Sequence, residues 1–268
     1  MKETLEKLVN GEISIEECEL ILKADSIMKL DNVANFDCGR KMRTGFPEAI
    51  LAESKDYDDL VRIIKKYYEG EDPKRENLII TRLSQERFDL LKDDLSYLLK
   101  KNLKFHYNTH GRILIIYKDK LKTINPKLGK IGILTAGTSD LFIAEETKVI
   151  VEQGGCEVIT SYDIGIAGIH RLFPQIAKMI EEDVSVIIVC AGMEGALPSV
   201  VAGLVDIPVI GVPTSVGYGI GADGKAALYA MLQSCAPGLS VVNIDNGFGA
   251  GVFALTLVNT IAKMNKGN

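Results

Sequence analysis

A cysteine stands near the end of the chain, at the point where a helical pattern meets a turn. In the stretch MLQSCAPG, Met231–Gly238, Cys235 precedes an Ala-Pro-Gly turn that must end the helix. A thiolate is a strong nucleophile, but the carboxyl end of a helix disfavours negative charge, so activation would require a nearby cation. Judged from its neighbours alone, Cys235 is better explained as a structural thiol than as a catalytic one.

Glu194 is a second candidate for chemistry, and it follows a strongly apolar run. The segment CAGMEGALPS places Glu194 among Gly and Ala residues, with Gly192 two positions earlier. The carboxylate could act as a desolvated general base, or it could pair with the start of a helix. Because the small neighbours leave room for a ligand, we favour the general base and take Gly192 as a substrate-binding position.

A small-residue turn in the segment ILTAGTSD could bind phosphate. An apolar run leads into Gly137, and Ser139 and Asp140 then precede a helical pattern. Backbone N–H groups at such a helix start attract anions. The same residues could simply cap the helix, and the segment lacks the Lys-Ser/Thr pair of a Walker A motif.

Two other segments carry cations. In DIGIAGIHRLFP, Arg171 follows His170 and lies close in sequence to Asp163. The Arg171 guanidinium could grip phosphate with two hydrogen bonds, or it could belong to a solvated ion pair. In GRKMRTGFPE, Arg40 and Arg43 could bind a second phosphate, although a solvated basic loop is the commoner case.

The elements that must position these residues are alternating strands and helices in the second half. Short apolar runs predict strands at 130–135, 156–160, 184–190, 207–212 and 239–244, with a closing helix over 249–264. This alternation predicts a three-layer α/β/α domain around a parallel, flavodoxin-like sheet. Ligands of such sheets bind at the carboxyl ends of the strands, where the Gly-rich segments fall.

The first half is more charged and predicts a smaller α/β domain. A capping box begins at Ser14, Ser84 caps another helix, and Gly70 closes a helix between them. A polar segment containing a proline follows and indicates a linker. We therefore expect an N-terminal domain over 1–126 and a C-terminal domain over 127–268.

Composition excludes several classes of function. The chain has 268 residues, 47% of them hydrophobic, and a formal net charge of −5, so neither a nucleic-acid partner nor a disordered chain is expected. Apolar runs are too short or too interrupted for a membrane partner. Five scattered cysteines without a CxxC pair, and three histidines, fit a cytoplasmic protein with free thiols and no dedicated metal cluster.

Taken in order, the segments AGTSD, GIHR and AGMEGALPSVVAGLVDIPVIGVP resemble signatures of the PurE family, which handles carboxyaminoimidazole ribonucleotides. Two positions depart from that family: Ala196 stands where it has an acid/base His, and Cys235 stands in a segment where it has no thiol. Both departures match the related LarB family. The segments FDCGRKMRTGFPEAILAESK, YDIGIAGIHRL, PTSVGYG and NIDNGFGAG extend this second resemblance over nearly the whole chain.

The resemblance to LarB implies an enzyme that carboxylates nicotinic acid adenine dinucleotide at pyridinium C5 with CO2 and hydrolyses its phosphoanhydride. The products would be pyridinium-3,5-biscarboxylic acid mononucleotide and AMP, which serve nickel-pincer nucleotide cofactor biosynthesis and lactate racemase maturation. The resemblance also implies a homo-octamer. Mg²⁺ would stabilise the charge of phosphoanhydride cleavage, and no organic cofactor is expected because the dinucleotide is the substrate.

This chemistry gives the thiol a use. CO2 and a pyridinium ring are both electrophiles, so the ring must first gain electrons, which thiolate addition at C4 would supply. The resemblance assigns Cys235 as nucleophile, Glu194 as the group that moves the C5 proton, and Asp163 as a group that orients the ring or the thiol. The expected nucleotide-binding residues are Ser139, Asp140, His170 and Arg171 for the mononucleotide, and Arg40 and Arg43 for the adenylate.

Two alternatives remain open at this stage. One is a PurE-type N5-carboxyaminoimidazole ribonucleotide mutase, against which Ala196 argues. The other is a non-catalytic nucleotide-binding module, which would retain the glycines and Arg171 but would have no use for Cys235 and Glu194.

Overall fold

A computed structural model describes residues 2–25, 27–30, 34–69, 77–99, 102–118 and 128–266. The chain forms two compact units. The first comprises Met1–His106 and Leu114–Leu121, and the second comprises Tyr107–Ile113 and Lys122–Asn268. The domain boundary predicted between residues 126 and 127 lies outside the described residues.

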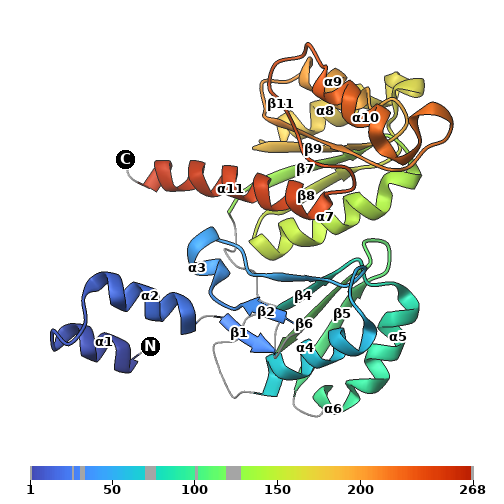
Figure 1. The fold of residues 1–268 in the computed structure, drawn as a ribbon. Helices are drawn as coiled ribbons and strands as arrows, with labels where there is room; N and C mark the ends of the chain where they lie inside the picture. Colours follow the sequence, from blue (N-terminus) through green and yellow to red (C-terminus); the bar gives the residue numbers. More distant parts are fainter. Residues whose placement is uncertain are drawn as a thin grey trace. The chain divides into compact units, whose positions relative to one another are not determined.

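The second unit is built on a five-stranded sheet (Figure 1). Its strands are β7 (Lys130–Thr135), β8 (Glu157–Ser161), β9 (Val186–Ala191), β10 (Val209–Pro213) and β11 (Leu239–Val241). The spatial order is β11-β10-β9-β7-β8, and every neighbouring pair is parallel. This order confirms the predicted parallel α/β fold, because the chain turns back at β7 and opens a crevice between β7 and β9.

Helices cover both faces of this sheet, as the continuous apolar strands require. All residues of β9 and β10 are buried. On one face, α8 (Leu172–Glu181), α9 (Leu197–Ala202) and α10 (Lys225–Leu232) contribute to one apolar cluster with the strands. On the other, α7 (Leu141–Gly154) and α11 (Gly247–Lys266) pack together so closely that a Cβ on Gly154 would lie 2.3 Å from a Leu255 methyl carbon.

The last strand is shorter than predicted, and α11 has an unusual composition. β11 ends at Val241, because Asp245 then turns the chain by accepting a hydrogen bond from the Ser215 N–H and donating its own N–H to the Pro213 carbonyl. Among the described residues, α11 is long and apolar enough to cross a membrane by length and composition. A core helix passes the same test, and Ala254 and Leu255 of α11 are buried within the unit.

The first unit is the smaller α/β domain expected from the sequence. Its four-stranded sheet has the order β3-β4-β6-β5, with β3 parallel to β4 and β6 antiparallel to β4. The strands are β3 (Ala49–Leu51), β4 (Leu78–Thr81), β5 (Leu103–Asn108) and β6 (Ile113–Lys118). The other elements are α1 (Lys2–Val9), α2 (Ile15–Asp25), β1 (Ile27–Leu30), β2 (Ala34–Asp37), α3 (Arg40–Thr44), α4 (Tyr57–Glu69), α5 (Gln85–Asp94) and α6 (Ser96–Leu99).

The predicted caps of the first unit are present where they can be seen. The Ser14 N–H donates to Glu17, whose N–H donates back to the Ser14 hydroxyl, and the Ser84 hydroxyl accepts the Arg87 N–H. Gly70, the predicted end of α4, lies outside the described residues. The prediction of a loop for the basic segment is wrong in part. The segment contains helix α3, which ends at Gly45 in the left-handed conformation.

The buried centre of β9 predicts a large loss of stability on truncation. We expect Ile188→Ala, at a fully buried position, to lower the free energy of unfolding by about 2–5 kcal/mol. Ile180→Ala on α8 is the matched control, since Ile180 is 51% exposed and should change the same quantity by only about 0.5 kcal/mol. Denaturant titration followed by circular dichroism measures both, and equal losses would contradict this assignment of the core.

Candidate functional site

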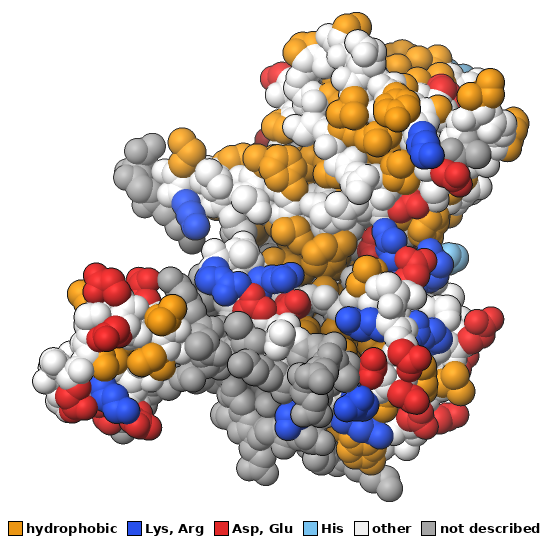
Figure 2. Space-filling view, in the orientation of Figure 1, with side chains coloured by type: hydrophobic (Ala, Val, Ile, Leu, Met, Phe, Trp, Pro, Cys, Tyr) orange, Lys and Arg blue, Asp and Glu red, His pale blue; other side chains and the backbone are white. Residues whose placement is uncertain are grey.

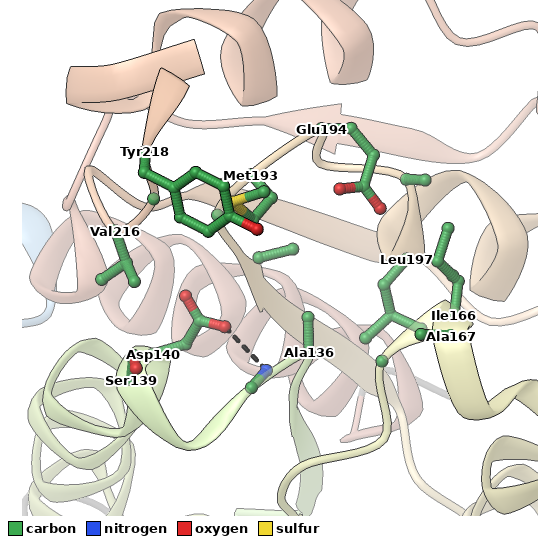
Figure 3. A pocket seen from close by; sticks show the side chains of 16 residues that line it. Ala136, Ser139, Asp140, Ile166, Ala167, Met193, Glu194, Leu197, Val216 and Tyr218 are labelled. Atoms are coloured by element: carbon green, nitrogen blue, oxygen red, sulfur yellow. Dashed lines mark hydrogen bonds between the residues drawn. The ribbon is translucent and has the colours of Figure 1, made fainter. Parts of the chain in front are cut away.

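A cavity of about 470 Å³ opens at the carboxyl ends of the parallel strands of the second unit (Figure 3). Its walls are the loops that follow β7, β8, β9 and β10, so it occupies the place that the switch in strand order creates. The lining residues are Ala136, Gly137, Ser139, Asp140, Gly165, Ile166, Ala167, Ala191, Gly192, Met193, Glu194, Ala196, Leu197, Val216, Gly217 and Tyr218.

The structure brings five of the predicted site residues together in this cavity. They are Gly137, Ser139, Asp140, Gly192 and Glu194. The loops after β7 and β9, which are far apart in the sequence, therefore converge on one space. Among the described residues, its lining includes two acidic side chains and no Lys, Arg or His.

Asp140 is held by the protein on both of its carboxylate oxygens. Its side chain is buried, the Gly137 N–H donates to Oδ2 at 2.9 Å, and the Thr214 hydroxyl donates to Oδ1 at 2.6 Å. Burial raises the pKa of Asp140, and the hydrogen bonds from Thr214, Gly137 and Gly192 oppose that rise. Asp140 thus fixes the turn after β7 by a hydrogen bond to the backbone.

Gly192 sits where no side chain fits. A Cβ there would lie 2.2 Å from the Val216 carbonyl oxygen and 2.7 Å from the Thr214 hydroxyl oxygen. The neighbouring Met193 N–H donates to the same Val216 carbonyl at 3.1 Å. The loops after β9 and β10 are therefore pressed together, and glycine permits that approach.

Glu194 extends from this tight contact into the open part of the site. Met193 and Gly195, on either side of it, both have positive φ, at 51° and 63°. This turn lifts Glu194 clear of the strand, and the side chain is exposed. Figure 3 shows its carboxylate directed into the space between Tyr218 and Leu197. A carboxylate so placed is able to accept a proton from a ligand in the cavity.

Asp163, His170 and Arg171 do not line the cavity. They belong to the loop after β8, whose residues Gly165, Ile166 and Ala167 do line it. Arg171 Nη1 lies 2.9 Å from Asp163 Oδ2, and both side chains are about half exposed. The structure therefore has the solvated ion pair that the sequence left open, next to the cavity wall.

Cys235 lies away from the cavity, near the amino ends of the strands. It follows α10 and precedes β11, and nearby Gly238 accepts the N–H of Val209, the first residue of β10. The cavity is at the other end of β10, and a five-residue strand spans roughly 16 Å. Within one chain, the structure does not bring Cys235 and Glu194 together.

Burial separates the five cysteines into two groups. Cys18, Cys156 and Cys190 are buried, whereas Cys38 and Cys235 are exposed. Burial raises the pKa of the Cys156 thiol to about 11 and also raises the pKa of Cys190 well above its ordinary value. Burial therefore disfavours the thiolate at Cys156 and Cys190.

Arg40 and Arg43 belong to the first unit and are engaged with carboxylates there. Arg43 pairs with Asp37, and Arg40 lies 3.3 Å from Glu48 and 3.8 Å from Asp37. These contacts explain how two cations are held close together on α3. Their expected role toward an adenylate stays a prediction.

Two residues of the site, Thr214 and Tyr218, were not predicted from the sequence. Thr214 is fully buried, and its hydroxyl bridges to Asp140, which only the fold reveals. Tyr218 lies on the cavity wall (Figure 3). The segment PTSVGYG, which contains both, was the available signal, because a polar, Gly-rich stretch after a buried strand marks a functional loop in a parallel sheet.

Both halves of the chain match known family models. Residues 130–266 match the model described as AIR carboxylase, and residues 27–118 match the model described as the LarB/PurE-like N-terminal domain. A crystal structure of a PurE2 variant from Treponema denticola covers 52% of this chain and 89% of its own, with a TM-score of 0.40 and 20% identity.

Relatives divide according to how much of the chain they share. An uncharacterized protein of Methanocaldococcus jannaschii is 48% identical over 95% of each chain. N5-carboxyaminoimidazole ribonucleotide mutases of M. jannaschii and Thermotoga maritima are 36% and 31% identical, over 48% of this chain and 78% and 74% of their own. The chain joins a LarB N-terminal domain to a PurE-like domain of the carboxylase or mutase type, and it therefore belongs to the LarB family.

Proposed function

We propose that this protein carboxylates nicotinic acid adenine dinucleotide at pyridinium C5 and hydrolyses its phosphoanhydride. The products are pyridinium-3,5-biscarboxylic acid mononucleotide and AMP, for nickel-pincer cofactor assembly in the cytoplasm. The observation that carries the proposal is the charge of the cavity, whose lining includes Asp140 and Glu194 but no cationic side chain. Carboxylates favour a cationic ring such as pyridinium, whereas a neutral aminoimidazole gains little from them.

The alanine at position 196 supports a pyridinium substrate rather than an aminoimidazole ribonucleotide. It lines the cavity at the position where the PurE signature carries a His. A mutase that moves a carboxyl group on aminoimidazole ribonucleotide would lack that acid/base group here. The pyridinium reaction instead needs a nucleophile and a base, for which Cys235 and Glu194 are available.

The proposed reaction balances without an oxidant or a reductant. The Cys235 thiolate forms a bond to ring C4, and the displaced electron pair moves to the ring nitrogen. C5, now the nucleophilic end of an enamine, forms a bond to CO2. Glu194 takes the C5 proton, the bond between sulfur and C4 breaks, and the aromatic cation returns with a new carboxylate.

This scheme requires Cys235 from a second copy of the chain, because within one chain Cys235 and the cavity lie at opposite ends of the strands. The helix before Cys235 supports such a contact, since Tyr229 and Leu232 of α10 are 67% and 64% exposed. Figure 2 shows hydrophobic side chains gathered over this part of the second unit. Exposed apolar surface of this kind marks an association site, and we propose a homo-octamer built through it.

We propose that side chains around the cavity bind the phosphates of the substrate together with a Mg²⁺ ion. Arg171 can exchange its exposed partner Asp163 for phosphate, with His170 next to it in sequence and Ser139 on the cavity wall. No group of three or more His, Cys, Asp or Glu side chains gathers within the described residues. We therefore propose that Mg²⁺ enters on the substrate's own phosphate oxygens, as is usual for this ion. We propose that Arg40 and Arg43 bind the adenylate.

The proposal predicts two products from one substrate. Purified protein incubated with the dinucleotide, bicarbonate and Mg²⁺ should release AMP and a dicarboxylated pyridinium mononucleotide in equal amounts, measured by mass spectrometry. It should leave N5-carboxyaminoimidazole ribonucleotide unchanged. Conversion of the aminoimidazole ribonucleotide, or AMP without carboxylated product, would contradict the proposal.

Substitution of the two exposed cysteines should affect carboxylation differently. Cys235→Ala should abolish carboxylation because the ring is then never activated, while Cys38→Ala, the matched exposed thiol, should retain it. Glu194→Gln should lower the rate of carboxylated product by about 100-fold or more, the usual contribution of a general base. Equal activity of Cys235→Ala and Cys38→Ala would exclude the covalent scheme.

The shared site predicts recovery of activity on mixing. Cys235→Ala protein, which should be inactive, and Glu194→Gln protein, which should be strongly impaired, are unfolded together, refolded and assayed. If the two residues of one site come from different chains, random assembly should restore about one quarter of the wild-type rate. Each variant refolded alone is the control. Failure of the mixture to exceed those controls, with octamers present by light scattering, would contradict the shared site.

A further inference from the structure

Tyr218 is a large aromatic side chain that stands at the rim of the cavity. Its side chain is 79% exposed, yet it lines the same space as Asp140 and Glu194. Figure 3 shows its ring beside Met193, on the wall next to the open centre of the cavity. On a cavity wall, an exposed tyrosine ring offers a large flat face against which a ligand ring can pack.

The backbone around Tyr218 is built to present this ring. Gly217 and Gly219 flank it with φ of 151° and 73°, values that other residues rarely adopt. A Cβ on Gly217 would come within 3.2 Å of the Met193 sulfur. The adjacent Val216 carbonyl is anchored by the Met193 N–H. The hydrogen bond to Val216 therefore fixes the start of this loop, and the two glycines allow the backbone conformation on either side of Tyr218.

The charges that face the ring suit a flat cation. Asp140 and Glu194 are the acidic side chains of the cavity lining, and no Lys, Arg or His accompanies them there. An aromatic face attracts a cation that lies over it, and nearby carboxylates add to this attraction. A neutral ring of the same size receives neither contribution.

We infer that Tyr218 is the specificity-determining residue that stacks on the oxidised pyridinium ring and discriminates it from the uncharged dihydropyridine form. This inference rests on the proposed substrate. It adds a side chain that acts in binding and ring selection rather than in making or breaking bonds. Phe at this position preserves the stacking face, and Leu removes it.

The affinity test compares two ligands that differ only in the charge of the ring. Calorimetry without bicarbonate measures the Kd of nicotinic acid adenine dinucleotide and of its reduced dihydro form. Wild type and Tyr218→Phe should prefer the oxidised ligand, and Tyr218→Leu should lose about 3- to 30-fold of that preference. In turnover, Tyr218→Leu should raise KM more than it lowers kcat. An unchanged preference in Tyr218→Leu would overturn the inference.

A spectroscopic test reports the stacking directly, because the chain contains no tryptophan. In Tyr218→Trp the new indole is the sole one, and a pyridinium ring in face contact should quench its emission as the oxidised ligand saturates. Tyr97→Trp, on α6 of the first unit at a side chain that is 39% exposed, is the matched control and should stay bright. Equal quenching of both, or of neither, would overturn the inference.

These measurements separate failure of the inference from failure of the proposed function. Selective quenching and ring preference in a protein that forms no carboxylated product would support Tyr218 and contradict only the reaction. Carboxylation that proceeds with an unchanged KM in Tyr218→Leu would contradict only the role of Tyr218.

Discussion

The hydrogen bond from the Thr214 hydroxyl to Asp140 is the interaction on which the site depends. It joins the loops after β7 and β10 across the end of β9, which lies between them in the sheet. Both groups are buried, so loss of either partner would leave the other desolvated and unsatisfied. The bond also explains Gly192, since a side chain there would meet the Thr214 hydroxyl. One buried contact thereby holds three cavity walls in place.

The sequence was sufficient for the architecture of the second unit and for the position of the cavity. Continuous apolar runs such as Val186–Ala191 are typical of strands buried on both faces, and glycine-rich ends mark where such sheets bind ligands. β11 and α3 were less predictable, because their ends depend on tertiary hydrogen bonds and on the left-handed Gly45. Periodicity does not encode either feature.

The candidate site was predictable only in part, for a topological reason. Glu194 and Asp140 follow neighbouring strands at the same edge of the sheet, so their proximity follows from the fold class. Cys235 follows helix α10, which returns the chain to the amino ends of the strands. A rule about the carboxyl ends of strands therefore could not place Cys235 in the cavity. Thr214 and Tyr218 were missed because their value comes from what faces them. A threonine matters here because a buried carboxylate lies 2.6 Å away, and a tyrosine because an acidic cavity lies beside it.

The proposed reaction begins when the Cys235 thiolate adds to a pyridinium ring, and peptide mass spectrometry can detect that adduct. Glu194→Gln protein is incubated with nicotinic acid adenine dinucleotide and bicarbonate, quenched in acid and digested. The covalent scheme predicts a mass increase from the bound pyridinium nucleotide on the peptide that contains Cys235, with the Cys38 peptide unmodified. Active wild-type protein together with an unmodified Cys235 peptide at every quench time, or the adduct on Cys38, would contradict it.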